Sequence, residues 1–256
     1  EAVFRNPAYT RQWHANLFNC ISEYSCTGGN NASGFTNVWS SLCGETLISS
    51  GPSSRLMEAG YNSSNAPLHR WWVLYREIRD AFIFLKRVTP LGAVEDEQQL
   101  TEESVCRMKA EAKVWRAWYH IRLLNWYGRN DGIPYVDKAL LPSEIYMART
   151  PVNECLDRIN AELDEVINSE ALPFIWDEGR RDRMSRSIAL TLKMDVNLQF
   201  KRYDIAKAAA WELIKSGEFE LYYSTATDNN LGKNYRDLFT YVGKQNKERI
   251  LYKGGG

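Results

Sequence analysis

The chain has 256 residues, of which 44% are hydrophobic and 25% charged, so it can bury a sizeable core. Lys and Arg together number 32, as do Asp and Glu, so no net charge favours binding to nucleic acid or to an anionic membrane surface. No apolar run reaches the length of about 18–20 residues that a membrane-spanning helix needs.

Residues 1–66 combine short apolar patches with loops rich in Gly, Asn and Ser, such as CTGGNNASGFTN and ISSGPSSRLMEAGYNSSNAP. This turn chemistry argues against a continuous helix over about residues 26–67, except in the stretch from Val38 to Leu47. We therefore predict an irregular N-terminal segment, residues 1–66, followed by a helical scaffold, residues 67–256.

Two long helices are predicted next, because apolar residues recur at steps of three and four. The first begins near Trp71 and ends near Pro90. The second begins after Thr101, an N-cap candidate followed by two glutamates, and ends at Gly128. Its apolar stripe consists of Val105, Met108, Ala112, Trp115, Tyr119, Leu123 and Trp126.

The aromatic residues of 111–136 are dense enough for a sugar platform, a membrane-surface helix or a thick core. Most of them fall on the apolar stripe of the second helix, which favours the core.

Three further helices follow. Thr150, with Pro151 at the first helical position, opens the third, and Ile188–Phe200 marks the fourth. Asp204 is expected to cap the fifth, Ile205–Lys215. The last two form a helix–turn–helix pair of about thirty residues, which suggests tetratricopeptide-like stacking. The predicted fold class is all-α, a tetratricopeptide-like superhelix of helical repeats.

Five cysteines, an odd number, do not form a closed disulfide framework. Cys106 and Cys155 fall inside helical patterns, where buried free thiols are expected. Cys20 and Cys26 are close enough in sequence to pair if the protein is exported. The histidines are scattered and none has the spacing of a zinc site, so we expect no metal and no cofactor.

Several segments carry a more specific pattern. The first helix contains W-x-x-L-Y-x-x-I, and the second contains an A-E-A…R-A…L…Y-G…P pattern. The second pattern is met by Ala110, Glu111, Ala112, Arg116, Ala117, Leu124, Tyr127, Gly128 and Pro134, with Trp115 in the aromatic position. Two later matches are Arg149, Thr150, Pro151, Val152 and Glu154, then Ala206, Ala209, Ile214, Gly217, Phe219 and Leu221.

In this order the segments resemble the SusD/RagB family, surface lipoproteins of Gram-negative bacteria that capture nutrients, usually glycans, for an outer-membrane transporter. The resemblance covers roughly residues 67–252. Phe82 stands where the family commonly has asparagine, and Ser187 where it commonly has glycine.

The resemblance implies a non-catalytic protein that binds glycans at the outer-membrane surface. It implies two partners, an oligo- or polysaccharide (with a peptide as a possible alternative) and a SusC-like TonB-dependent transporter. It also implies a lipid anchor on an N-terminal cysteine absent from this chain, and a C-terminal part of the family domain that is missing here. Trp115 and Tyr119 would be core, and Glu111 and Arg116 would fix their helix by hydrogen bonds to its neighbours.

A glycan site needs exposed aromatic faces and polar groups that pair with hydroxyls, usually on loops above a rigid scaffold. The candidate ligand residues are Trp39, Tyr61, Asn62, Asn65 and Trp72, the last lying off the helix stripe that contains Trp71. The alternative for these positions is a solvated loop with a buried Trp39.

Two other functions stay open. Helical repeats often bind proteins or peptides, so the chain could be an interaction scaffold. A helical glycoside hydrolase would use two carboxylates, but the sequence contains no nucleophile elbow, phosphate loop or metal motif.

Overall fold

The computed structural model describes residues 2–18, 70–92, 99–177, 183–223, 231–238, 240 and 246–251. Its elements are η1 (Ala2–Arg5), α1 (Pro7–Asn16), α4 (Trp71–Arg87), α5 (Glu102–Tyr127), η3 (Pro142–Glu144), α6 (Val152–Ser169), α7 (Arg186–Gln199), α8 (Tyr203–Lys215) and α9 (Leu231–Leu238). Over these residues the chain forms helices and two isolated β-bridges but no strand, so the all-α prediction is confirmed. No helix in the described part is long and apolar enough to cross a membrane.

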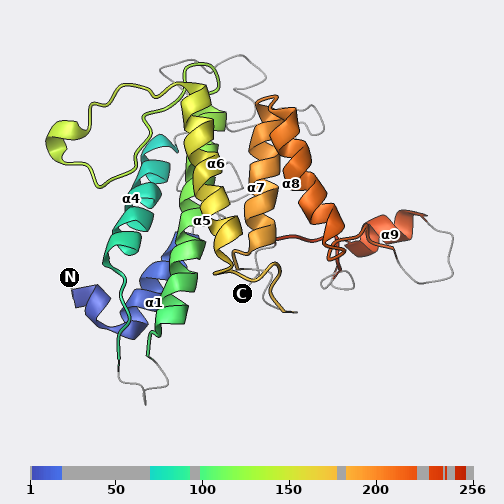
Figure 1. The fold of residues 1–256 in the computed structure, drawn as a ribbon, viewed down its shortest axis with the longest axis horizontal. Helices are drawn as coiled ribbons and strands as arrows, with labels where there is room; N and C mark the ends of the chain where they lie inside the picture. Colours follow the sequence, from blue (N-terminus) through green and yellow to red (C-terminus); the bar gives the residue numbers. More distant parts are fainter. Residues whose placement is uncertain are drawn as a thin grey trace, which may run out of the picture.

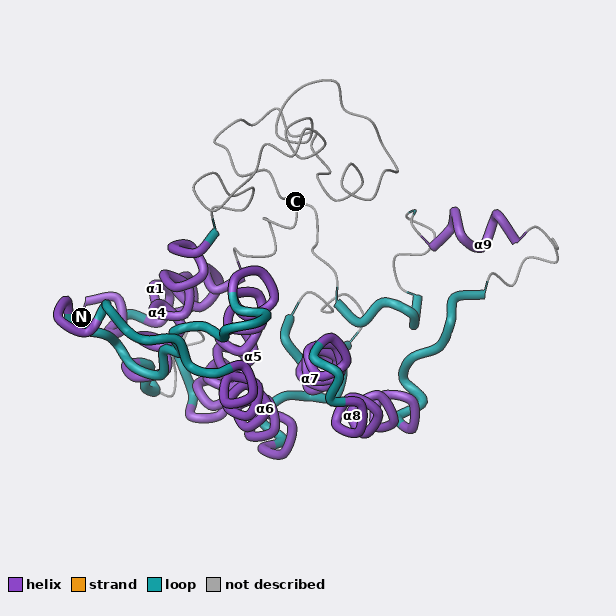
Figure 2. Tube along the Cα trace, turned by 90° about the horizontal axis from the view of Figure 1, so that it is seen from above, coloured by secondary structure: helices purple, strands orange, loops and turns teal. Residues whose placement is uncertain are grey.

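Helices α4 to α8 stand side by side in the order of the chain (Figure 1). Each packs against the next: α4 on α5, α5 on α6, α6 on α7 and α7 on α8. Seen from above, the row runs from α4 at one side to α8 at the other (Figure 2). Packing between neighbours in sequence is typical of helical-repeat proteins.

The ends of α5 follow the predicted caps. The Thr101 side chain accepts a hydrogen bond from the Ser104 backbone amide at 3.1 Å, which confirms Thr101 as the N-cap. Gly128 follows the last helical residue, and a Cβ atom there would lie 2.6 Å from the Gly132 carbonyl oxygen. The chain therefore needs glycine at this position to turn back against the end of α5.

Two predicted caps are wrong by one or two residues. Helix α6 begins at Val152 with Pro151 as N-cap, because the Thr150 amide donates instead to the Ile133 carbonyl at 2.8 Å in a β-bridge. Helix α8 begins at Tyr203, so Asp204 lies within its first turn, where its charge still suits the positive helix end.

The cysteine predictions have mixed outcomes. Cys155 is a buried free thiol, as expected, but Cys106 is exposed, so that prediction is wrong. Cys106 lies beside the buried Val105 but on the side of α5 that faces solvent near the start of the helix. Cys20 and Cys26 lie outside the described residues, and the boundary predicted at residue 66 stays a prediction.

The predicted core role of the aromatics in α5 is confirmed by Trp115 and Tyr119, which are fully buried. The single stripe predicted for α5 is too narrow, since positions between the stripe residues are buried as well. These are Ala110, Val114, Ala117, Ile121 and Leu124. Helix α5 is therefore covered on several sides by α4, α6 and α7.

Two charged side chains of α5, Glu111 and Arg116, pair with side chains from other parts of the chain. The Glu111 carboxylate, fully buried, accepts from Arg183 at 2.5 Å and lies 3.1 Å from His14 Nε2. Arg116 forms an ion pair with Glu162 of α6 at 2.6 Å. Both contacts confirm that Glu111 and Arg116 fix the position of α5.

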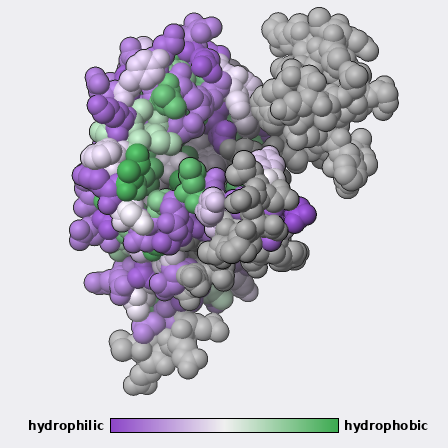
Figure 3. Space-filling view, turned by 90° about the vertical axis from the view of Figure 1, so that its right-hand side faces the viewer, coloured by the Kyte–Doolittle hydropathy of each residue, from purple (hydrophilic) through white to green (hydrophobic). Residues whose placement is uncertain are grey.

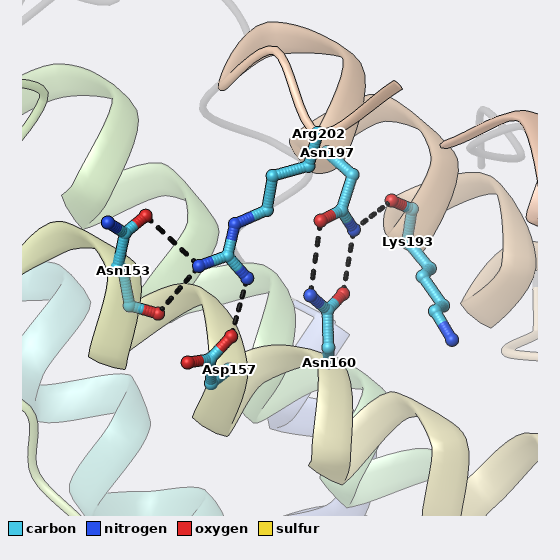
Figure 4. Close-up of polar contacts among 6 residues, drawn as sticks. All are labelled: Asn153, Asp157, Asn160, Lys193, Asn197 and Arg202. Atoms are coloured by element: carbon cyan, nitrogen blue, oxygen red, sulfur yellow. Dashed lines mark hydrogen bonds and ion pairs between the residues drawn. The ribbon is translucent and has the colours of Figure 1, made fainter. Parts of the chain in front are cut away.

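A pair of buried amides joins α6 to α7 (Figure 4). The amide nitrogen of Asn160 donates to Asn197 Oδ1 at 3.1 Å, and that of Asn197 donates back to Asn160 Oδ1 at 2.7 Å. Nearby, Arg202 spans from the α7–α8 turn to Asp157 and Asn153 on α6. Such reciprocal bonds fix the relative position of the two helices along their axes.

The face at the α8–α9 end exposes large apolar side chains. Those on α8 are Tyr203, Trp211 and Ile214, and Leu198 adds to them from the end of α7. Figure 3, which looks at this end, shows hydrophobic side chains gathered among hydrophilic ones.

Replacing one amide of the buried Asn160–Asn197 pair should lower the stability of the fold, because the other amide then loses its hydrogen-bond partner. We expect Asn197→Leu to lower the free energy of unfolding by about 1–3 kcal/mol, because the Asn160 amide stays buried without its partner. The double variant, Asn160→Leu with Asn197→Leu, should lose less stability than the sum of the two single variants. Urea unfolding of the unaltered protein, the two single variants and the double variant measures this coupling. Strictly additive losses would contradict it.

Trp115 should be among the most sensitive positions of the core. Its ring packs against Phe18 at 4.8 Å and Trp118 at 6.0 Å between ring centroids. We expect Trp115→Ala to destabilise the fold by about 3–5 kcal/mol, the usual cost of removing a buried large aromatic. Thermal unfolding tests this, with Trp211→Ala as a control because Trp211 is 55% exposed. Equal melting temperatures for the two variants would refute the core role.

Candidate functional site

An apolar pocket of about 640 Å³ lies between α4 and the connection that leads from α5 to α6. Both segments contribute side chains to it. They are Trp71, Trp72, Tyr75, Arg76, Arg79, Pro134, Val136, Lys138, Leu140, Pro142, Ile145 and Met147. A volume of this size is typical of pockets that bind small molecules.

The first turn of α4 presents two tryptophans in different directions. Trp71 packs edge-on against Tyr75 and Tyr127, with ring centroids 5.0 and 5.3 Å apart, and belongs to the edge of the core. Trp72, one residue later, is 62% exposed, because neighbours on a helix point about 100° apart. The Arg76 guanidinium lies 5.2 Å from the centre of the Trp72 ring. Trp72 thus offers a ring face at the edge of the pocket.

The opposite wall is held in place by hydrogen bonds to its backbone. The Tyr75 hydroxyl donates to the Pro134 carbonyl at 2.7 Å, and Arg149 donates to the Gly132 carbonyl at 2.5 Å. Burial raises the pKa of Tyr75, so its phenol remains a donor at physiological pH. These bonds hold the start of the wall, at residues 132–134, in place.

Tyr135 fixes the same wall from behind. It lies between two pocket-lining residues, Pro134 and Val136, yet its own ring is buried and stacks on His120 with centroids 4.1 Å apart and planes at 9°. Burial lowers the pKa of His120 to about 3, so the imidazole is neutral at physiological pH. The two stacked rings are neutral, so they can be buried behind the wall without a charged partner.

The lining of the pocket suits the binding of a molecule. It offers an aromatic face, apolar walls and side-chain donors, which suit stacking and hydrogen bonding. Among the described residues no cluster of His, Cys, Asp or Glu could hold a metal ion.

Of the five candidate ligand residues, Trp72 lies at this pocket. Trp39, Tyr61, Asn62 and Asn65 lie outside the described residues, so the structure does not test them. The sequence does not predict the wall residues of 134–147, because no predicted element covers the stretch between Gly128 and Thr150. A run of apolar residues with Lys138 and two prolines in that stretch was the available signal.

A family model of SusD-like proteins, described as "Starch-binding associating with outer membrane", matches residues 23–194, well over half of the chain. The chain belongs to the SusD-like family. The resemblance read from the sequence is confirmed, and the family is one of non-catalytic glycan-binding proteins associated with the outer membrane. A comparison with curated proteins finds no match.

Solved SusD-like structures share the fold. A SusD-like protein from Bacteroides fragilis is 20% identical, with a TM-score of 0.73 over 100% of this chain and 46% of its own. A laminarin-binding SusD-like protein is 23% identical, with a TM-score of 0.72 over 97% of this chain and 51% of its own. A surface glycan-binding protein from Bacteroides thetaiotaomicron, solved with laminarihexaose, is 16% identical, with a TM-score of 0.67 over 95% of this chain and 48% of its own. The chain thus spans about half the length of these relatives and has the SusD-like fold of tetratricopeptide-like helices.

The hydrogen bond from Tyr75 to the wall should contribute measurably to stability. We expect Tyr75→Phe to lower the free energy of unfolding by about 0.5–1.5 kcal/mol, because the Pro134 carbonyl loses its donor. Tyr146→Phe is the matched control, since Tyr146 is 94% exposed. Denaturant unfolding compares them, and a Tyr75 variant as stable as the control would show that the bond does not hold the wall.

Proposed function

We propose that the protein binds glycans at the outer-membrane surface and passes them on chemically unchanged. The observation that carries this proposal is the match to the SusD-like family. Two structures with the same fold support the ligand class, since one is described as laminarin-binding and another was solved with laminarihexaose. Because both are less than 25% identical to this chain, they leave the choice of glycan open.

Within this proposal, Trp72 stacks on the apolar face of a sugar ring. Its exposure and its place at the pocket edge support that role. The pocket walls would exclude water from one side of the sugar while the side-chain donors pair with hydroxyls. Trp39, Tyr61, Asn62 and Asn65 remain proposed ligand residues on the grounds of their side-chain chemistry.

The proposed protein partner is a SusC-like TonB-dependent transporter, and the proposed location is the outer-membrane surface, with a lipid anchor. The outer-membrane association of the family supports both. Co-purification of a transporter with the full-length protein would test the partnership directly.

A protein-binding scaffold is the second candidate function. The exposed apolar side chains of α8, Trp211 and Ile214 among them, favour it, since apolar patches on a surface often mark contacts with other proteins. The two functions use opposite ends of the helix row, because the pocket lies at α4 (Figure 1).

Trp72→Ala should weaken glycan binding about tenfold. Aromatic contacts contribute about 0.5–1.5 kcal/mol beyond the area that they bury, and about 1.4 kcal/mol corresponds to a factor of ten. Isothermal titration of the full-length protein with the glycan that it binds measures the change. Trp211→Ala, the control, should bind normally.

The same samples, analysed for shortened oligosaccharides, test the absence of cleavage. Cleavage that depends on one Asp or Glu would overturn the proposal. Equal loss of binding in the Trp72 and Trp211 variants would remove the role given to the pocket.

A further inference from the structure

The charged side chains that line the pocket between α4 and the α5–α6 connection all have the same sign. They are Arg76, Arg79 and Lys138, and none of the described lining residues carries a carboxylate. The whole chain has no net charge, so three cations in one lining are not a consequence of its composition. Each has an acidic neighbour outside the lining: Glu77, Asp80 and Glu144. A pocket with apolar walls concentrates the field of such charges on whatever occupies it.

The two arginines share a row with the aromatic ring. Trp72, Arg76 and Arg79 follow one another at steps of four and three, the spacing that places side chains on one face of a helix. Lys138 comes from the opposite wall. The pocket therefore combines one stacking surface with cations on two sides.

Each of these cations has an acidic partner next to the pocket. Arg79 Nη1 lies 3.7 Å from Asp80 Oδ1, beyond hydrogen-bond distance, and the Arg79 side chain is 63% exposed. Arg76 pairs with Glu77 at 2.8 Å and Lys138 with Glu144 at 2.5 Å, but both cationic side chains are more than half exposed. Exposed ion pairs contribute little to stability, so a ligand can share or replace the partners of Arg79 and Lys138 at low cost. Glu77 is largely buried and would be costly to leave unpaired, so a ligand shares Arg76 with Glu77 and does not replace it.

We propose that this pocket takes an acidic glycan, a sugar chain whose anionic groups pair with Arg79, Arg76 and Lys138 while one ring stacks on Trp72. A guanidinium binds a carboxylate or a sulfate through two parallel hydrogen bonds, which suits both kinds of acidic sugar. The inference rests on the proposed function and narrows its ligand from glycans in general to anionic ones.

The test measures binding of the full-length protein to five polysaccharides by isothermal titration at two salt concentrations. Polygalacturonate and alginate carry carboxylates only, and carrageenan carries sulfates only. Methyl-esterified polygalacturonate has the same backbone with its charge removed, and laminarin is neutral. We expect at least one acidic polymer to bind about tenfold more tightly than the neutral ones, with an affinity that falls as salt rises. Whether the polymer carries carboxylate or sulfate identifies the anionic group.

Two arginine variants separate this site from general attraction between charges. Arg79→Gln should weaken binding of the acidic polymer about tenfold. Arg236→Gln is the matched control, because Arg236 is similarly exposed and also lies 3.7 Å from the aspartate that follows it, but it does not line the pocket. The control should bind as the unaltered protein does.

Each other outcome overturns the inference. Binding of laminarin without any acidic polymer contradicts it and leaves the proposed function intact. Equal losses in the Arg79 and Arg236 variants indicate unspecific attraction and contradict it as well. No binding to any of the five polymers, together with no binding in a wider neutral screen, contradicts the proposed function and this inference together.

Discussion

The burial of α5 on several sides is the constraint on which the rest of the structure depends. A helix of 26 residues with Trp115 and Tyr119 fully buried must be surrounded, so α4, α6 and α7 all pack against it. Its buried charges also need partners at defined positions, because a buried carboxylate such as Glu111 is costly unless it is paired. Arg183, from a distant part of the chain, meets that demand, and His14 Nε2 lies 3.1 Å from the same carboxylate, so both contacts fix where those parts of the chain lie.

The pocket follows from this arrangement. The chain that leaves α5 at Gly128 runs out past α4 and returns before α6 begins at Val152. Tyr75 and the buried Tyr135 fasten the returning segment at a fixed distance from α4. The space left between them is lined by side chains of both segments, so the rigidity of the core is transmitted to the candidate site.

The sequence predicts α4 to α8 well, since each shows an apolar periodicity typical of a helix. It does not predict α9 or α1, which lies in the segment 1–66 expected to be irregular. Predictions from the sequence fail at positions where contacts with distant parts of the chain replace the local ones. Thr150 is a good N-cap by type, but its backbone pairs with Ile133, and the helix starts later. Cys106 falls inside a helical pattern, but it lies beside the apolar stripe of α5 and is exposed. The pocket depends on residues more than sixty positions apart, whose proximity no local pattern records.

The aromatic residues show why density alone does not identify a binding site. The richest aromatic stretch belongs to α5, where Trp115 is enclosed by other rings and is inaccessible to any ligand. The exposed tryptophan at the pocket is Trp72, on a helix with fewer tryptophans, and its position points away from the core. The same holds for charge. Equal numbers of acidic and basic residues make the chain neutral, yet Arg79 and Lys138, from separate segments, face one cavity whose lining contains no acid among the described residues. The properties that decide what such a cavity binds are therefore local, and they arise only when the fold brings α4 and the α5–α6 connection together.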